Sequence, residues 1–240
     1  MKSGKTVFRL NQAIAKAGIC SRRQADELIA SGRVALNGNI TAHYNCLVDP
    51  AVDRLSVDGK PALWRQFTYV AMNKPRGVIT TCSDEFGRTG ILDLLPDKLR
   101  HLRPVGRLDR DSEGLIIITN DGELTQKVTH PLHHLSKRYI VSVKGKVRHE
   151  DLEKMSTGLE LSCGKTQPAV VKAVSSSAEL SIIAITLQEG KNRQIRRMCS
   201  CLGYQVVRLV RVAIGGLQLG QMVPGSWRYL TPSEIKMLES

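Results

Sequence analysis

The chain has 240 residues, of which 42% are hydrophobic, and this is typical of a folded protein with one medium-sized domain and one small domain. Its 35 basic and 22 acidic residues give a formal net charge of +13, which favours a polyanionic partner such as nucleic acid, although a basic surface that serves only solubility stays open. The N-terminus lacks an apolar core of signal-peptide length and the longest apolar runs are too short to cross a bilayer, so we expect a cytoplasmic protein with no membrane partner.

The first 60 residues predict a small α/β module. Apolar residues at helical spacing indicate a first helix, which Gly18 ends. Ser21 and Gln24 form a capping-box pattern that begins a second helix. Asn37 followed by Gly38 is typical of a tight hairpin turn. These signals place helices at residues 8–17 and 21–32, and strands at residues 33–36, 39–44 and 54–60.

Two arginines of this module occupy an unfavourable place on the second helix. Arg22 and Arg23 lie in its first turn, where the helix dipole disfavours positive charge by roughly a few tenths of a kcal/mol. Residues 1–65 hold ten basic and five acidic residues, a net charge of +5. We therefore expect a phosphate-binding surface formed by Lys16, Arg22, Arg23 and Arg33, with an ordinary solvated face as the alternative.

A larger domain follows a linker in residues 59–67, so we place the domains at residues 1–62 and 67–240. Strands and helices mix without strict βαβ alternation, which predicts an α+β fold with a mixed, mainly antiparallel sheet. Strands are expected at residues 68–75, 76–80, 114–119, 137–146, 179–190, 206–220 and 225–230. Helical segments are expected at residues 88–99, 123–130, 149–159 and from Thr231 or Ser233 to the end.

A further helix carries a second cluster of arginines. It is predicted to begin after Asn192 as the N-cap and to end at Gly203. Arg193, Arg196 and Arg197 gather at its start, where positive charge is least favourable, so we expect an anion near them.

The stretch GRLDRDSEGLIIITND places Asp109 between Arg107 and Arg110, directly ahead of an apolar strand. This carboxylate could be a salt-bridged structural residue, a calcium ligand or a catalyst. Asp111 and Glu113 imitate the start of a calcium-binding loop, but position 12 is an asparagine and the two flanking helices are lacking. Calcium is therefore disfavoured, whereas simple pairing with the neighbouring arginines stays open.

Several ordered motifs carry a resemblance to a known family. The segment RLNQAIAKAGICSRRQADELIASGRVALNGN resembles the S4 RNA-binding module. Downstream, MNKPRGV, GRLDRDSEGL, KRYIV and GKNRQIRRM follow in the order found in RsuA-type ribosomal RNA pseudouridine synthases, which carry an N-terminal S4 domain. The chain resembles this family over nearly its whole length, most closely the RluF-like large-subunit branch.

The resemblance implies a catalytic site. It makes Asp109 the catalyst, which attacks the sugar or pyrimidine or helps to deprotonate C2′, so that the glycosidic bond breaks and uracil rejoins through C5. Arg196 would be the ion-pair partner of Asp109, since an adjacent guanidinium favours an ionised carboxylate. Tyr139 would stack on the flipped uracil, and Ile195 would pack near the base. From the strand pattern alone, Tyr139 could equally be a core residue.

Further positive side chains would contact phosphates, which position RNA without specifying its sequence. They are Lys74, Arg107, Arg110, Arg193 and Arg197 in the larger domain, and Lys16, Arg22, Arg23 and Arg33 in the S4 module. An isomerisation needs no cofactor, and the sequence has no P-loop or GxGxxG turn. The six scattered cysteines contain no C-x-x-C pair, so we expect reduced thiols and no metal.

The expected partner is ribosomal RNA, more specifically 23S rRNA, bound by a monomer. A 16S rRNA or a tRNA is the alternative substrate. Two other classes of function are alternatives: an S4 RNA-binding assembly factor without catalysis, and a metal-dependent nuclease that uses Asp109, Asp111 and Glu113.

Overall fold

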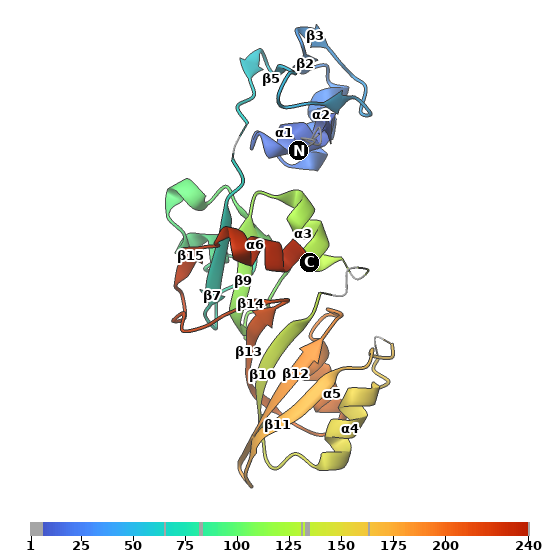
Figure 1. Cartoon of the computed structure of the whole chain (residues 1–240), viewed down its shortest axis with the longest axis vertical. Helices are drawn as coiled ribbons and strands as arrows, with labels where there is room; N and C mark the ends of the chain where they lie inside the picture. The colour runs from blue at the N-terminus through green and yellow to red at the C-terminus, as the bar shows by residue number, and fades with distance from the viewer. Residues whose placement is uncertain are drawn as a thin grey trace. The chain divides into compact units, whose positions relative to one another are not determined.

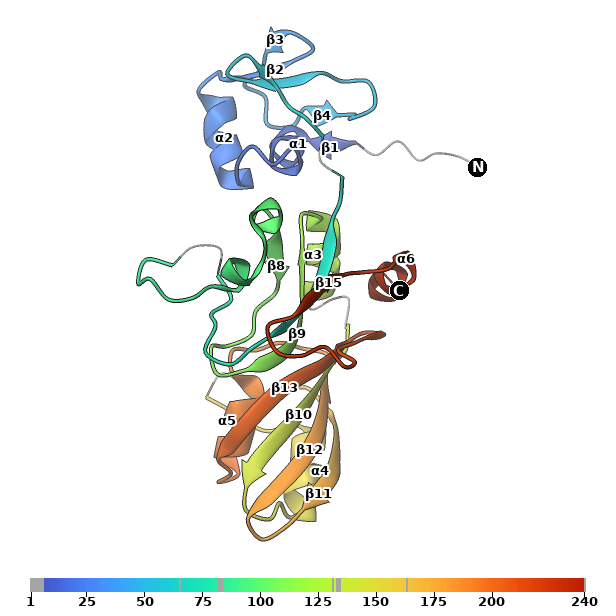
Figure 2. The same cartoon turned by 90° about the vertical axis from the view of Figure 1, so that its left-hand side faces the viewer.

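The computed structural model describes residues 7–64, 66–81, 84–130, 132, 135–162 and 164–239. The chain divides into two compact units, Met1–Phe67 and Thr68–Ser240. The elements of each unit are labelled in Figure 1 and turned by 90° in Figure 2.

The first unit packs two helices on short strands. Its elements are β1 (Phe8–Arg9), α1 (Leu10–Lys16), α2 (Arg22–Ala30), β2 (Val34–Leu36), β3 (Asn39–Ile40), β4 (Leu47–Val48), β5 (Leu55–Val57) and β6 (Lys60–Pro61). The strands form a four-stranded sheet in the order β3-β2-β5-β6 and a separate β1-β4 pair. Leu10, Ile14, Ile29 and Val34 are fully buried in one apolar core, which is where the helical spacing of the sequence directs them.

Local signals of this unit act as predicted. Ser21 accepts a hydrogen bond from the Gln24 backbone N–H, and the Gln24 side chain accepts one from the Ser21 N–H, which completes the capping box of α2. Asn37 and Gly38 have φ values of 52° and 85°, as a tight turn between β2 and β3 requires.

The second unit is built on one mixed sheet. Its strands are β7 (Tyr69–Lys74), β8 (Arg103–Val105), β9 (Glu113–Thr119), β10 (Lys137–Lys144), β11 (Val170–Ser176), β12 (Leu180–Leu187), β13 (Val206–Ile214), β14 (Leu217–Gln218) and β15 (Trp227–Tyr229). The main order is β11-β12-β10-β13-β9-β7-β15, and β14 and β8 pair with β13 and β9. Among the described strands, only β9 and β13 pair in parallel, so the predicted mixed, mainly antiparallel α+β fold is confirmed.

Strand β9 joins the two halves of this sheet. Its upstream end pairs with β13 at Glu113 and Gly114, whereas its downstream end pairs with β8 on that same edge. Ile116 and Ile118 enter one apolar core and Leu115 and Ile117 enter another, so both faces of the strand are buried. A strand covered on both faces needs apolar residues at successive positions, which explains the run GLIIIT.

Helices cover the two halves separately. In Figure 1, α4 (His149–Thr157) and α5 (Gln194–Cys201) lie beside β10, β12 and β11, and they share the apolar core of that half. α3 (Gly122–Thr129) and α6 (Pro232–Glu239) contribute to the core on one face of β7 and β9. Two short 3-10 turns, Ile91–Leu94 and Asp97–Leu99, contribute to the core on the opposite face.

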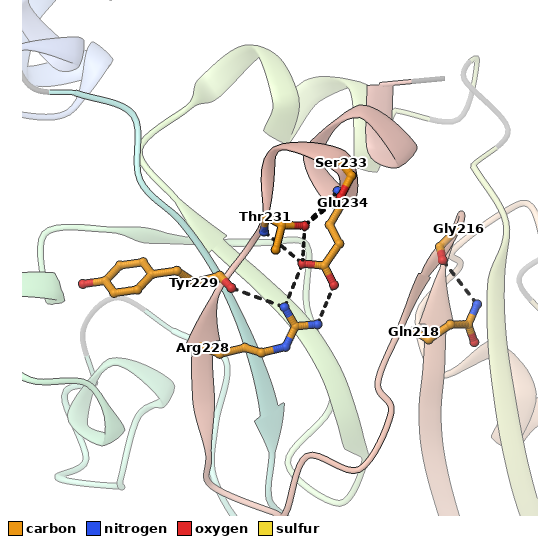
Figure 3. A network of polar contacts seen from close by, with 7 residues as sticks. All are labelled: Gly216, Gln218, Arg228, Tyr229, Thr231, Ser233 and Glu234. Carbon is orange, nitrogen blue, oxygen red and sulfur yellow. Dashed lines mark hydrogen bonds and ion pairs between the residues drawn. The ribbon is translucent and has the colours of Figure 1, made fainter.

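Helix α6 is fixed at its start by a polar network. Figure 3 shows the Arg228 guanidinium facing the Glu234 carboxylate, to which it donates two hydrogen bonds of 2.8 and 2.6 Å. Glu234 also accepts from the Thr231 backbone N–H, and the Thr231 hydroxyl accepts from the Glu234 N–H. Thr231 is thus the N-cap, and the ion pair ties the helix to β15.

Some sequence predictions of elements are wrong. Residues 76–80 do not continue as a strand, because Gly77 turns the chain at φ 90° and leaves only a single bridge between Ile79 and Gly90. The strand expected over 39–44 is limited to Asn39–Ile40. The sequence also missed β1, β4, β6, β8 and β11. Four of these are only two or three residues long, and β11 is mostly exposed on both faces, so none shows a clear apolar period.

No helix in the described part of the chain is long and apolar enough to cross a membrane. Of the cysteines, Cys20, Cys46, Cys199 and Cys201 are free thiols. Burial raises the pKa of the Cys199 thiol to about 12. Cys82 and Cys163 lie outside the described residues.

Candidate active site

The Asp109 carboxylate lies at the point where the two halves of the large sheet meet. It belongs to the loop between β8 and β9, directly ahead of the parallel pairing of β9 with β13. The Asp109 side chain is 30% exposed, so it is open to a ligand although its neighbour Leu108 is buried. The loop thus presents one carboxylate at the edge of a packed core.

A buried lysine fixes this loop by hydrogen bonds to its backbone carbonyls. Lys74 ends β7 and is 0% exposed. Its Nζ donates hydrogen bonds to the carbonyls of Pro75 at 2.9 Å, Arg110 at 3.4 Å and Ser112 at 2.7 Å. Burial lowers the pKa of Lys74 to about 8, while Glu113, Asp109 and Asp111 oppose that shift. Lys74 was predicted to contact phosphate, and that prediction is wrong because its ammonium is enclosed by protein.

A threonine holds the same loop on the other side of Asp109. The buried Thr80 hydroxyl donates to the Leu108 carbonyl at 2.8 Å and accepts from the Leu108 N–H at 3.3 Å. The Gly77 N–H donates to the Arg110 carbonyl at 2.8 Å. Bonds on both flanks therefore fix the backbone of Asp109, and sequence reasoning missed Thr80 because one polar residue in an apolar stretch carries no specific signal.

Two guanidinium groups of the second arginine cluster approach the Asp109 loop. Arg193 Nη1 lies 3.9 Å from Asp109 Oδ2. Arg196 Nη2 donates to the Asp111 carbonyl at 2.9 Å, and its Nε is buried without a partner among the described residues. The predicted ion pair between Asp109 and Arg196 is therefore not formed, and Arg193 takes that place. Burial and the charge of Arg193 lower the pKa of Arg196, and Asp109 and Asp111 oppose this shift.

The backbone at the start of α5 explains why Arg193, and not Arg196, approaches Asp109. Arg193, not the predicted Asn192, is the N-cap residue, and it has a left-handed backbone with φ 51°. A residue other than glycine seldom adopts this conformation, and such outliers cluster at functional sites. The first turn is instead held by Gln194, whose side chain accepts from the Lys191 N–H and donates to Glu189. Arg193 is left free to extend toward Asp109.

Tyr139 lies at the junction of two apolar cores. On β10 it pairs with Ile185 of β12 and Arg211 of β13, next to a register shift between Arg138 and Tyr139. It is partly buried against both the α4–α5 core and the core that contains Leu108. No described residue hydrogen-bonds to its hydroxyl. Ile195 is 4% exposed and packs within the α4–α5 core.

A cavity of about 400 Å³ opens in front of Asp109. Its walls include four arginines, Arg88, Arg107, Arg110 and Arg193, together with the loop that contains Phe86. Arg107 and Arg110 are exposed, as phosphate contacts would need, whereas Arg197 is partly buried and bonds to Asn192 at 3.2 Å. The cavity thus brings Asp109 together with four arginines, while Glu85 and Asp84, which pairs with Arg88, also line it.

The carboxylates near Asp109 do not gather into a metal site. Glu113 accepts two hydrogen bonds from Arg208, at 3.0 and 2.8 Å, and this pairing lowers the pKa of Glu113. Among the described residues, no three His, Cys, Asp or Glu side chains are placed to hold a metal ion.

The predicted RNA contacts of the first unit differ in their surroundings. Arg22 and Arg23 are exposed at the start of α2. Arg33 is exposed but already pairs with Asp58 at 2.6 Å. Lys16 Nζ lies 3.3 Å from the ring centre of Phe8 and 4.6 Å from that of Phe67, a cation–π arrangement.

Two family models match the chain. A model described as RNA pseudouridylate synthase matches residues 68–201, and the S4 domain model matches residues 8–50. The first covers more than half of the chain, and the two matches fall in the two units described above.

Relatives match along nearly the whole length. The chain is 39% identical to the ribosomal large subunit pseudouridine synthase B of Bacillus subtilis, over 97% of this chain and 96% of the relative. It is 38% identical to an uncharacterised RNA pseudouridine synthase of Aquifex aeolicus, over 96% and 93%. The dual-specificity RNA pseudouridine synthase RluF of Salmonella typhi is 37% identical, over 96% and 78%. A solved crystal structure of a pseudouridylate synthase superposes with a TM-score of 0.70 at 29% identity, covering 96% of this chain and 99% of that one.

Proposed function

The chain belongs to the RNA pseudouridylate synthase family with an N-terminal S4 domain, and we propose that it isomerises one uridine of ribosomal RNA with Asp109 as the catalytic carboxylate. The observation that supports this most is the placement of Asp109. It lines a cavity walled by four arginines, and its backbone is fixed by bonds on both flanks. A preorganised charge facing a cationic RNA-binding wall is what this reaction requires.

The reaction rearranges one nucleoside without any outside group. The N1–C1′ bond of uridine breaks, uracil turns over in the site, and C5 bonds to C1′ while the C5 proton is lost and N1 regains a proton. Asp109 either attacks the sugar or pyrimidine, or removes a proton from C2′, to start this sequence. Both routes need an ionised carboxylate. Arg193 Nη1 lies 3.9 Å from Asp109 Oδ2. No redox change occurs, so we propose that no cofactor or metal takes part.

We assign supporting roles to three further residues. Tyr139 stacks on the extruded uracil, since an aromatic face is a common support for a flipped base. Ile195 packs behind it from the α4–α5 core. Arg196 fixes the loop through the Asp111 carbonyl and, with its buried Nε unpaired in this structure, has a donor left for the bound nucleotide or for Asp109 once RNA is in place.

We propose large-subunit (23S) rRNA as the substrate, bound by a monomer in the cytoplasm. The Bacillus subtilis relative named for the large ribosomal subunit, matched over 96% of its length, supports this choice. The Salmonella typhi relative is named dual-specificity, so a second RNA such as a tRNA is the alternative, with 16S rRNA as another. Arg107, Arg110, Arg193 and Arg197 would contact phosphates in the second unit, and Lys16, Arg22, Arg23 and Arg33 in the S4 unit.

Mapping pseudouridine in rRNA from cells that lack this protein tests the proposal. One uridine of 23S rRNA should lose its modification, and the wild-type gene should restore it, whereas Asp109→Asn should not. Equal restoration by both genes would remove Asp109 from the catalytic role. Missing modification in 16S rRNA or tRNA instead would change the substrate but keep the reaction.

Two outcomes separate the proposed reaction from a metal-dependent nuclease and from a non-catalytic assembly factor. Activity of the purified protein on the mapped rRNA fragment in excess EDTA should equal its activity without EDTA, because the proposed chemistry uses no metal. Loss of activity in EDTA with cleavage of the RNA would support the nuclease. An intact protein that binds the fragment but forms no pseudouridine would support the assembly factor.

A further inference from the structure

A short loop on the wall of the Asp109 cavity is held rigid by its own aspartate. The Asp84 carboxylate accepts from the backbone N–H groups of Phe86 at 3.2 Å and Arg88 at 2.7 Å. It also accepts from the Arg88 guanidinium, with Nη2 at 2.5 Å and Nε at 3.1 Å. The Arg88 hydrogen bond lowers the pKa of Asp84, so the carboxylate stays charged at neutral pH. One side chain, only 9% exposed, therefore fixes the backbone of residues 84–88.

This loop presents an aromatic ring to solvent. Phe86 is 79% exposed, whereas Phe8 is 6% exposed in the core of the first unit. The Arg88 guanidinium carbon lies 5.0 Å from the Phe86 ring centre, within the range of a cation–π contact. A guanidinium against the ring on a fixed loop gives Phe86 a defined position while most of its surface remains uncovered. A single exposed apolar residue needs no explanation in itself, so its location decides what it can do.

The location is the wall of the proposed catalytic cavity. Phe86 and Arg88 line the same cavity as Asp109, and Phe86 is the sole aromatic residue among its lining residues. Arg107, Arg110 and Arg193 line it as well, together with Glu85 and with Asp84, which is already paired with Arg88. A flat apolar ring beside several cations matches a nucleotide, which offers a π-face and a phosphate together. An apolar protein partner would not explain the surrounding positive charge.

We propose that Phe86, backed by Arg88, is a stacking platform for an unpaired nucleobase next to the target uridine in the RNA substrate. This inference rests on the proposed function, because it assumes that RNA enters the Asp109 cavity. Extruding a uridine leaves its neighbours partly unstacked, and an aromatic face beside the site compensates for that loss. Arg88 already pairs with Asp84, so its role here is to position the ring and not to neutralise a phosphate.

Substitutions at Phe86 separate stacking from simple apolar contact. Binding is measured with the rRNA fragment that carries the mapped uridine, in the Asp109→Asn background, so that no turnover occurs. Phe86→Ala and Phe86→Leu should weaken binding roughly 5- to 150-fold, the range that alanine substitution gives for one stacked base. Phe86→Tyr and Phe86→Trp should bind within about threefold of the parent, because they keep the π-face. The salt dependence of binding should not change in any of them, since no charge is removed.

Tyr229→Ala is the matched control. Tyr229 is 51% exposed on β15, does not line the cavity, and its ring points away from the Arg228–Glu234 pair in Figure 3. Loss of the Tyr229 side chain should leave RNA binding unchanged.

A crosslinking experiment tests the position of Phe86 directly. 5-Iodouridine is placed at each position that flanks the target uridine. At one of those positions it should form a photo-crosslink to Phe86, identified by mass spectrometry.

Failure of the platform and failure of the proposed function give different results. If a protein with native Asp109 forms pseudouridine in the fragment but Phe86→Leu binds and crosslinks as well as the parent, the platform is refuted and the function stands. If that protein forms no pseudouridine in the fragment, the function itself is refuted. Equal losses for Phe86→Tyr and Phe86→Ala would also overturn the platform, because a stacking role tolerates tyrosine.

Discussion

At the scale of single residues, the site depends on a positive charge that cannot touch the substrate. Lys74 is enclosed by the carbonyls of Pro75, Arg110 and Ser112, the last two of which follow Asp109 in its turn. A charged donor serves several buried carbonyls at once, which an apolar side chain cannot do. The lysine therefore contributes to the geometry of Asp109, while exposed arginines contribute to RNA binding.

Replacing Lys74 by methionine should uncouple catalysis from binding. The substitution keeps the side-chain length but leaves buried carbonyls without their donor, so the free energy of unfolding should fall by roughly 2–5 kcal/mol. Displacement of Asp109 should lower kcat by about 10- to 100-fold. The dissociation constant for rRNA and its salt dependence should not change, and single-turnover kinetics with filter binding would measure both.

Arg110→Gln is the comparison variant, and it should change RNA binding but not stability. Its side chain is exposed on the cavity wall, so its loss should weaken RNA binding and reduce the salt slope by about one, with little effect on stability. If Lys74→Met has normal kcat but binds RNA more weakly and with less salt dependence, Lys74 contacts phosphate and does not position Asp109.

Which residues meet at this site was only partly predictable. The order of motifs indicated Asp109 and the arginines after residue 190. The role of Lys74 could not be predicted, because its carbonyl partners at Arg110 and Ser112 are 36 and 38 residues away. The choice between Arg193 and Arg196 depends on the left-handed backbone at Arg193, which no local pattern encodes.

At the scale of elements, the parallel contact between β9 and β13 joins the two halves of the large sheet. It is short, with Glu113 opposite Val210 and Gly114 opposite Arg211. Gly114 has φ 105°, and a Cβ placed there would lie 2.3 Å from the Arg211 carbonyl oxygen. The closeness of the two backbones therefore requires glycine at this position.

Gly114→Ala should open this contact. The added methyl group collides with backbone and the positive φ is strained for alanine, so we expect a loss of about 2–4 kcal/mol in the free energy of unfolding. Gly122→Ala is the control, since nothing lies within 4 Å of its Cβ position and its φ is not positive. In the first turn of α3 that change should be neutral or stabilising. Chemical denaturation of both variants measures the difference, and similar losses would contradict the steric argument.

The attachment of α6 should depend on pH. Hydrogen bonds from Arg228 hold the pKa of Glu234 at about 2, below the 4.5 of an unperturbed glutamate. A lowered folded-state pKa stabilises the protein above pH 4.5 and loses that effect as pH falls toward 2. Amide protection of α6 should therefore drop over this window by about 1–2 kcal/mol in local opening free energy.

Two variants test this dependence. Glu234→Gln should already have low α6 protection at neutral pH and should show a flatter response to acid. Glu179→Gln, at an exposed carboxylate for which α6 supplies no contact, should follow the wild type. An unchanged acid response in Glu234→Gln would show that other carboxylates control α6.

How well an element could be predicted followed from how deeply it is buried. Strand β9 and helix α2 were predicted from an apolar run and a capping box, because a strong local signal coincides with a packed environment. Strand β11 was missed, since its mostly exposed residues, from Val170 to Ser176, carry no period and only pairing with β12 makes them a strand.

At the scale of the whole molecule, charge is spread over two units with separate cores. Residues 1–65 carry +5 of the total net charge of +13. The apolar core of the first unit contains residues from Phe8 to Trp64 only, and the three cores of the second contain residues from Tyr69 onward. We therefore expect residues 68–240 to fold without the first unit, with weaker rRNA binding and a shallower salt dependence.

The S4 contribution should rest mainly on Arg22 and Arg23. Asp58 already offsets the charge of Arg33, and the Lys16 ammonium would have to leave the Phe8 ring to reach a phosphate. Arg22→Gln with Arg23→Gln should reduce the salt slope of rRNA binding by about two. The same change removes positive charge from the start of α2, so the first unit should become more stable by a few tenths of a kcal/mol, roughly.

Weaker RNA binding together with higher stability is the result expected if Arg22 and Arg23 bind RNA. If they served the structure of the unit, their loss would not make it more stable. Arg54→Gln, at another exposed arginine of the same unit, should leave the salt slope within about a quarter of its wild-type value, because no contact is assigned to it. Filter binding between low and moderate salt, together with thermal unfolding of the first unit, measures both quantities. An unchanged slope in the double variant would assign the charge of α2 to solubility, and RNA binding would then depend on the second unit and its arginine-lined cavity alone.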